Sequence, residues 1–143
     1  MKILLDTNVW IAFLRNPVQW AGFESRMNRP LLLMSSVVAL ELLAGCRTPS
    51  RERALVNLLK PFEKADRVVT PDHLCFRKAG HVLASLANDG IGPVHRRQLL
   101  NDILIAVSAA RAGAVVITNN VSDFSRIQTH TPVRWMLPSL HLS

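Results

Sequence analysis

The chain has few aromatic residues and only two cysteines. Aromatic residues make up 6% of its 143 residues and tyrosine is absent, so the sequence poorly supplies the broad base-stacking surface of proteins that bind single-stranded nucleic acid. Cys46 and Cys75 have no CxxC spacing. Such isolated cysteines predict neither a disulfide framework nor a zinc site, and we expect two buried free thiols.

Long apolar runs are also missing. The longest one begins at Leu31 and is interrupted by two serines and by Glu41, whereas a membrane-spanning helix needs about 20 apolar residues. The amino terminus has one lysine and three apolar residues before Asp6, so it lacks the apolar core of a secretory signal. The sequence therefore predicts a soluble cytoplasmic protein with no membrane partner.

Acidic residues are outnumbered by basic ones. The chain has 10 Asp and Glu against 17 Lys and Arg, a formal net charge of +7 and a pI near 10.7. A basic surface attracts polyanions, so nucleic acid or an anionic membrane surface is the natural partner to consider. A hydrophobic content of 49% with 19% charged residues is typical of a compact globular chain. The length predicts a single domain over residues 1–143.

Apolar runs with strand character alternate with helical patterns along the chain. Strands are predicted over residues 2–5, 31–35, 67–70, 114–118 and 133–137, the last as an edge strand. Helices are predicted over residues 9–15, 18–29, 37–45, 50–62, 72–88, 96–113 and 122–127. Strands separated by helices predict right-handed crossovers, so the expected fold is a small doubly wound α/β/α sandwich with a mainly parallel central sheet.

Asp6 ends the first predicted strand and precedes a helix. In an open parallel sheet, ligands bind in the crevice beyond the carboxyl ends of the strands, so Asp6 lies where chemistry is expected. The alternative is that Asp6 or Thr7 only caps the following helix, which is a common role for Asp and Thr. The other acids of the chain bear on this choice.

Glu41 and Asp102 lie in helices that are apolar nearly all round, a pattern typical of buried helices. Neither has a cation three or four residues away, so neither can form an ion pair within its own helix. A salt bridge to a distant Lys or Arg is one explanation for each acid. The other is that Asp6, Glu41 and Asp102 converge on one site.

A second polar segment follows the strand predicted over residues 114–118. If this strand lies beside the first one, Thr118 and Asp123 reach the same crevice, and Asn119 and Asn120 shape the turn between them. Asp123 can equally serve as the cap of the short helix that follows. Its place in the site therefore depends on the order of the strands.

Carboxylates gathered in one pocket repel one another, because each charge disfavours the ionised form of its neighbours. A divalent cation removes that penalty. Mg²⁺ and Mn²⁺ prefer oxygen ligands, and Mg²⁺ typically keeps several waters while binding carboxylates and substrate phosphates. The acids therefore predict an Mg²⁺ or Mn²⁺ site that uses no His or Cys ligand.

Four segments, in this order, resemble the motif regions of PIN-domain ribonucleases, and more closely those of the VapC-type toxins of bacterial toxin-antitoxin pairs. They are LDTNVWIAFL at 5–14, SSVVALELLAG at 35–45, NDILIAVSA at 101–109 and GAVVITNNVSDF at 113–124. The resemblance implies that Asp6, Glu41, Asp102 and Asp123 surround Mg²⁺ or Mn²⁺, with Thr118 as a supporting polar residue. It also implies a homodimer, and inhibition by a cognate antitoxin whose tail enters the active site.

The expected activity is that of a metal-dependent endoribonuclease, which hydrolyses RNA phosphodiester bonds by attack of water on phosphorus. No Ser, Cys or His is placed as a nucleophile beside a base in the sequence motifs, which favours water over a covalent intermediate. Arg96 and Arg97 are candidates for holding substrate phosphates, although both equally suit a solvated helix start. Asn8 and Asn120 are further candidate substrate contacts.

Two other functions are alternatives to this one. A phosphatase of haloacid-dehalogenase type also begins with a strand that ends in Asp, but such enzymes have a second Asp two residues later, where this chain has Asn8. A non-catalytic nucleic-acid-binding domain uses only the basic charge. It has no need for Glu41 or Asp102 inside apolar helices.

Overall fold

A five-stranded parallel sheet lies at the centre of the computed structural model, which describes residues 1–26 and 30–139. The strands are β1 (Lys2–Leu5), β2 (Leu31–Ser35), β3 (Val68–Val69), β4 (Ala114–Ile117) and β5 (Trp135–Met136). Their order in the sheet is β3-β2-β1-β4-β5, and every neighbouring pair is parallel. Because β1 has a neighbour on each side, residues at the carboxyl ends of β1, β2 and β4 come together at one edge.

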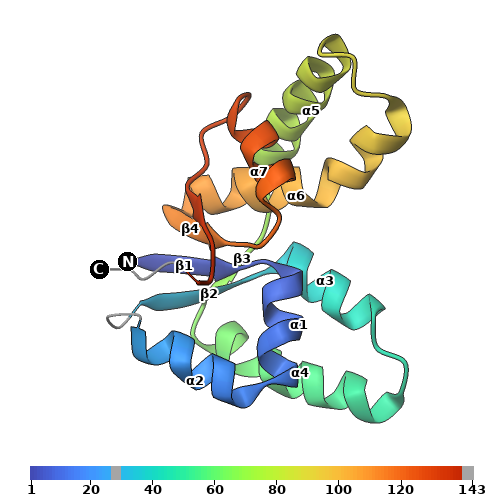
Figure 1. Cartoon of the computed structure of the whole chain (residues 1–143). Coiled ribbons are helices and arrows are strands. Elements are labelled where there is room, and N and C mark those ends of the chain that lie inside the picture. Colours follow the sequence, from blue (N-terminus) through green and yellow to red (C-terminus); the bar gives the residue numbers. More distant parts are fainter. Residues whose placement is uncertain (27–29, 140–143) are drawn as a thin grey trace.

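Helices cover both faces of this sheet (Figure 1). They are α1 (Thr7–Arg15), α2 (Pro17–Arg26), α3 (Ser36–Ala44), α4 (Pro49–Lys64), α5 (His73–Asn88), α6 (Pro93–Ala112) and α7 (Val121–Gln128). Figure 1 shows α1, α2 and α4 on one face and α6 and α7 on the other, with α5 packed on α6 and α3 at the edge where β2 ends. The predicted doubly wound α/β/α sandwich is confirmed. Its predicted span of residues 1–143 as one domain stays a prediction.

The core forms where β1 and β4 pack against α6. Leu4, Leu5 and Ile117 have no exposed surface, and every residue of α6 from Ile103 to Ala109 is buried. Burying one Leu or Ile side chain stabilises the fold by about 1.5–3 kcal/mol. This burial on all sides explains why the α6 sequence lacks an amphipathic pattern, and it fixes the helix that carries Asp102.

Local capping signals set where the elements begin and end. The Ser35 hydroxyl accepts hydrogen bonds from the backbone N–H groups of Val37 and Val38 and so starts α3. Thr48 caps α4 in the same way. Asp72, expected in the first turn of its helix, is instead the N-cap of α5, where its carboxylate accepts from the Cys75 N–H. Gly113 ends α6 with a φ of 71°, the left-handed conformation that glycine adopts without strain.

Further sequence expectations differ in detail from the structure. The predicted edge strand is short, because only Trp135 and Met136 pair with β4. Cys75 is buried as expected, whereas Cys46 is only half-buried. The last three residues of the helix predicted over 18–29 lie outside the described residues. In the part of the chain that the structure describes, none of the helices has the length and hydropathy that crossing a membrane requires.

Candidate active site

Asp6 lies at the carboxyl end of β1 with only 5% of its surface exposed. Its Oδ1 accepts a hydrogen bond of 2.8 Å from the Thr7 N–H, so Asp6 is the N-cap of α1. Its Oδ2 accepts a hydrogen bond of 2.7 Å from the hydroxyl of Thr118 at the end of β4. Asp6 therefore caps the helix with one oxygen and contacts the neighbouring strand with the other, so capping does not account for the whole side chain.

Thr7 connects this position to Glu41. The Thr7 hydroxyl donates a hydrogen bond of 2.8 Å to Glu41 Oε1, across from the first helix to α3. Thr7 is buried and Glu41 is half-buried, so one side of the glutamate stays open to solvent. The sequence motifs do not predict this role of Thr7. The available signal was a hydroxyl directly after a site acid, at the first position of a helix.

Asn120 joins the remaining two acids. Its side-chain Nδ2 donates to Asp102 Oδ2 at 2.9 Å and to Asp123 Oδ2 at 2.8 Å, and its backbone N–H donates to the Thr118 hydroxyl at 2.9 Å. The side chain makes no capping bond to α7, which begins after Asn120. A continuous set of hydrogen bonds thus links all four carboxylates, from Glu41 to Asp123.

Asp123 lies in the first turn of α7 and is half-buried. The N-cap position belongs to Asn120, so the interpretation of Asp123 as a helix cap is wrong. Its carboxylate instead accepts a hydrogen bond from the side-chain amide of Asn120, which also donates to the carboxylate of Asp102. The sheet order β1-β4 brings this residue to the edge where Asp6 lies.

No cation neutralises this group of acids within residues 1–26 and 30–139. The ion pairs in that part of the chain are Arg111–Asp72 and His130–Asp89, both elsewhere. The distant salt bridge considered for Glu41 and for Asp102 is therefore absent among the described side chains. Among the described residues, the four carboxylates have no ion-pair partner.

The two most affected carboxyl groups hold their protons more tightly than usual. Burial raises the pKa of Asp102 to about 7, and the negative charges of Asp6, Asp123 and Glu41 add to this, against the opposing hydrogen bond from Asn120. Burial also raises the pKa of Asp6, while the hydrogen bonds from Thr118 and Thr7 oppose the shift. Burial is thus the main reason why these two carboxyl groups resist ionisation, and the negative charges of the neighbouring acids add to it.

The chemistry of these donors fits a hard divalent cation, since all are carboxylate oxygens. No three His, Cys, Asp or Glu side chains among the described residues already form a ready-made metal cage. Mg²⁺ does not require one, because it commonly binds through one or two carboxylates and completes its shell with water and substrate phosphates. The residues therefore suit an ion that some of the four carboxylates would bind directly and the others through water.

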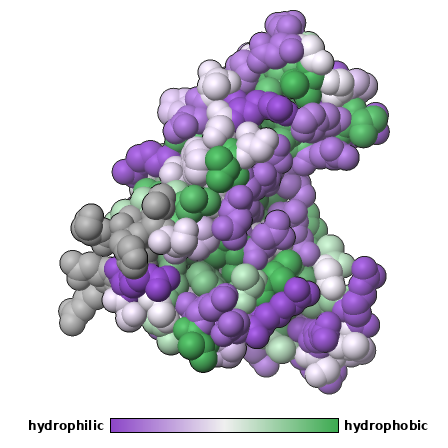
Figure 2. Space-filling model, viewed as in Figure 1, coloured by the Kyte–Doolittle hydropathy of each residue, from purple (hydrophilic) through white to green (hydrophobic). Residues whose placement is uncertain are grey.

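Figure 2 shows a hollow in the surface between the α5–α6 pair and the α3–α4 pair, lined largely by hydrophilic residues. The carboxyl ends of the central strands face this side of the molecule (Figure 1). Beside Glu41, a cavity of about 520 Å³ opens among α1, α3 and α4. Its walls are mainly apolar and include Ile11, Leu14, Leu42, Leu55 and Leu58, together with Arg15 and Arg51.

The predicted substrate contacts lie in different places. Asn120 is inside the acid network, whereas Asn8 is exposed on α1. Arg96 and Arg97 line a shallow pocket with Leu83 of α5 and Leu100, and the buried Arg96 Nε has no hydrogen-bond partner among the described residues. Their roles in substrate binding stay predictions.

A parallel sheet with carboxylates gathered beyond the carboxyl ends of its central strands belongs to the class of α/β proteins that bind their ligand at this edge. The profile of the PIN domain matches residues 3–129, and the chain belongs to this family. It is 30% identical over 129 residues to the tRNA(fMet)-specific endonuclease VapC of Salmonella typhimurium and 26% identical to its namesake of Shigella flexneri. Each alignment covers 89% of this chain and 92% of the relative.

Solved structures agree with the sequence relatives. The structure of VapBC-1 from nontypeable Haemophilus influenzae superposes with a TM-score of 0.70 and 27% identity, covering 98% of this chain and all of that one. The chain is therefore a PIN-domain protein of the VapC type, and the resemblance seen in its sequence motifs is confirmed. The haloacid-dehalogenase and binding-module alternatives are not favoured.

Proposed function

We propose that Asp6, Glu41, Asp102 and Asp123 hold Mg²⁺ or Mn²⁺ in an endoribonuclease that is the toxin of a toxin-antitoxin pair. The endoribonuclease and toxin functions follow from the VapC relatives, and the metal and the residue roles are our inference. The observation that carries this inference is the hydrogen-bond network that unites four carboxylates without a cationic partner among the described residues.

The hydrogen-bond donors around the acids would position them for this role. Thr118 directs one oxygen of Asp6, Thr7 directs one oxygen of Glu41, and Asn120 holds one oxygen each of Asp102 and Asp123. The second oxygens of Glu41, Asp102 and Asp123 are left for ligand binding, and the two Asp6 oxygens, which each accept one hydrogen bond, keep further lone pairs for it. Partners that orient a ligating carboxylate typically matter about 10–100-fold for metal affinity or activity.

A bound Mg²⁺ or Mn²⁺ would lower the proton affinity of water and stabilise charge on the phosphate oxygens. The chain itself would orient the reacting groups, because its buried threonines and Asn120 fix the carboxylates before substrate arrives. The Thr7 and Thr118 hydroxyls already donate to carboxylates. We therefore infer direct attack by water rather than by a side-chain nucleophile.

Cleavage of RNA by the purified protein tests this proposal. We expect cleavage of total RNA with Mn²⁺, loss of cleavage with EDTA, and a loss of at least about 100-fold in Asp102→Asn. Initiator tRNA is the first defined substrate to try, because the two VapC relatives are named for tRNA(fMet). Cleavage that persists unchanged in EDTA would contradict the metal site.

Metal binding can be measured separately from cleavage. At an Mn²⁺ concentration about 100 times its Kd, the free energy of unfolding should rise by about 2.7 kcal/mol, because the ion binds only the folded state. Asp6→Asn should lose most of this gain. Asp66→Asn is the matched control, since it removes the same charge from an exposed residue. Equal gains in both variants would place the ion elsewhere.

A cognate antitoxin and a second copy of the chain are the further partners that we propose. The apolar walls of the cavity beside Glu41 suit an apolar antitoxin segment, and Leu14 at its rim is 50% exposed. Exposed apolar side chains on α5 and α6, such as Phe76 and Val94, offer contact area for a homodimer. Light scattering of the purified chain, alone and with the antitoxin, tests both. A cytoplasmic location stays a prediction.

A further inference from the structure

The side chain of Arg126 on α7 contacts a histidine and forms no ion pair with an acid among the described residues. One of its guanidinium nitrogens lies 3.3 Å from Nε2 of His95 in the first turn of α6. Arginine is always protonated in proteins and can only donate, so Nε2 is the acceptor and the imidazole in this contact is neutral, with its proton on Nδ1. His95 therefore orients Arg126 without cancelling its charge.

The pair lies on the same two helices as Asp102 and Asp123. Arg126 follows Asp123 by three residues, so the two side chains neighbour each other on one face of α7. His95 precedes Asp102 by seven residues, which is close to two full turns and about 10 Å along α6. Because Asn120 ties Asp123 to Asp102, α6 and α7 run antiparallel here, with the acids at one end and the Arg126–His95 pair further along.

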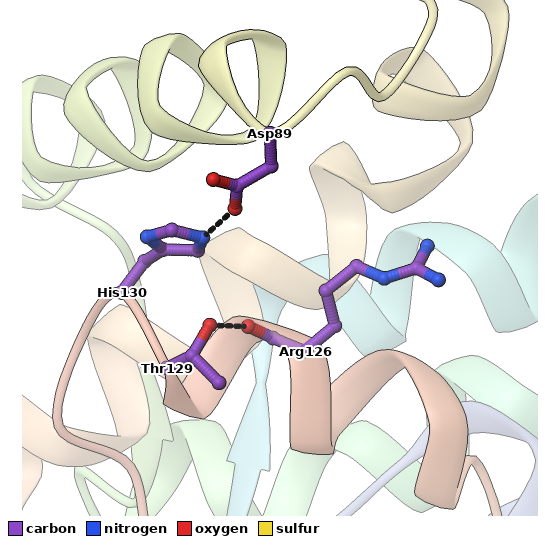
Figure 3. Close-up of polar contacts among 4 residues, drawn as sticks. All are labelled: Asp89, Arg126, Thr129 and His130. Atoms are coloured by element: carbon purple, nitrogen blue, oxygen red, sulfur yellow. Dashed lines mark hydrogen bonds and ion pairs between the residues drawn. The ribbon is translucent and has the colours of Figure 1, made fainter.

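The charge of Arg126 is available to a ligand. The carboxylate of Asp89 lies near the end of α7 but is held by His130 at 2.6 Å, and Figure 3 shows the Arg126 guanidinium pointing away from that contact. No carboxylate of the described residues lies within ion-pair distance of Arg126. The side chain is half-buried, so its orientation is restrained by packing as well as by His95.

Arg96 and Arg97 are placed differently, although they are adjacent to His95 in sequence. Both line the pocket formed with Leu83 of α5, whereas His95 faces α7. A strand of RNA that runs along α6 and α7 to the acids would therefore pass Arg126 rather than Arg96 and Arg97.

We propose that Arg126, oriented by His95, binds an RNA phosphate that neighbours the phosphate being cut. This inference rests on the proposed ribonuclease function and names a substrate contact for it. A guanidinium can donate two parallel hydrogen bonds to one phosphate. Such a contact fixes the position of the strand without reading its sequence. Arg126 is thus assigned as a binding residue and His95 as its positioning residue.

Salt-dependent RNA binding tests the proposal. Binding of a short fluorescent single-stranded RNA is measured with Mg²⁺ in the Asp102→Asn background, which should leave the probe intact. Loss of one phosphate contact lowers the slope of log affinity against log salt by about 0.7 for single strands. We expect this change in Arg126→Ala with about 10-fold weaker binding, and a slope close to the parent in Arg126→Lys, which keeps the charge.

Control variants separate this contact from net charge and from folding. Arg53→Ala removes the same charge from an exposed position on α4 and should leave the slope unchanged. His95→Ala should weaken binding, and His95→Gln, which keeps an acceptor, should restore it. Thermal unfolding of each variant reports whether it is folded, and Arg126→Gln, which removes the charge but keeps most of the side chain, carries the test if Arg126→Ala is not.

The outcomes distinguish the two levels of the proposal. Degradation of the probe by the Asp102→Asn protein overturns the proposed site and this inference with it. An intact probe with the same slope for Arg126→Ala and its parent overturns this inference alone. An equal drop in slope for Arg53→Ala also overturns it, because the effect would then belong to net charge.

Discussion

Thr118 Oγ1 lies 2.7 Å from Asp6 Oδ2, although the two residues are 112 positions apart in the chain. The contact exists because β1 and β4 are parallel neighbours, with Leu5 opposite Ile117, so that the residue after each strand meets the other. Thr118 has no exposed surface. The hydroxyl therefore donates its hydrogen bond to Asp6 without competition from water.

Replacing Thr118 with valine should impair the site while keeping the packing volume. The variant leaves one buried Asp6 oxygen without its donor, so we expect the pKa of Asp6 to rise further and cleavage to fall by about 10–100-fold. Initial rates of RNA cleavage at saturating Mn²⁺ measure this. Thr118→Ser keeps the hydroxyl and is the matched control. Equal rates for valine and serine would argue against a role for the hydrogen bond.

Asn120 should matter more than its exposed neighbour Asn119. Asn120→Ala removes the donor shared by Asp102 and Asp123, so the two carboxylates lose their common restraint and we expect about 10–100-fold slower cleavage. Asn119→Ala removes the same amide from a side chain outside the network. We expect it to retain nearly full activity. Similar losses in both variants would point to a general effect on the turn.

The raised pKa of Asp102 predicts how stability depends on pH. Its folded-state pKa of about 7 lies above the ordinary value of 3.8, so the folded state binds more protons than the unfolded state between these values. The free energy of unfolding should therefore fall as pH rises from about 4 to about 7. With allowance for solvent screening at this half-buried site, we expect a contribution of about 1–2 kcal/mol.

Urea unfolding at several pH values in EDTA measures this contribution. Asp102→Asn cannot ionise at this position, so its stability should depend less on pH and should exceed that of the wild type near pH 7.5. Asp6 is still present in the variant and retains its own raised pKa, so some dependence remains. Parallel pH curves for the two proteins would show that Asp102 ionises normally.

Gly113 should be sensitive to substitution for conformational reasons alone. Its φ of 71° disfavours any residue with a Cβ, yet a Cβ placed there meets nothing within 4 Å. Gly113→Ala should therefore lower the free energy of unfolding by about 1 kcal/mol. Gly80→Ala, inside α5 and equally unobstructed, should raise it by about 0.5–1 kcal/mol. Chemical denaturation of both variants checks the opposite signs.

Much of the fold could be predicted from the sequence because its signals are local. Four apolar residues in a row predict a buried central strand such as β4, and Gly113 predicts the end of α6. The sequence predicts Asp72 in the first turn of a helix over residues 72–88, whereas α5 begins one residue later and Asp72 is its N-cap. Asp is favoured at both positions, so the sequence does not distinguish them. The candidate acids could be selected because Glu41 and Asp102 break an apolar pattern.

The sequence by itself therefore determined the order of strands and helices, the capping residues and which acids needed an explanation. Only the tertiary structure decided how side chains meet: that Asn120 holds two acids, that Thr7 reaches Glu41, and that Arg126 contacts His95 while Arg96 lines a pocket with α5. The physical reason is the distance along the chain over which each interaction acts. Caps and periodicity act within one or two turns, whereas these contacts depend on how whole helices are rotated and packed on the sheet.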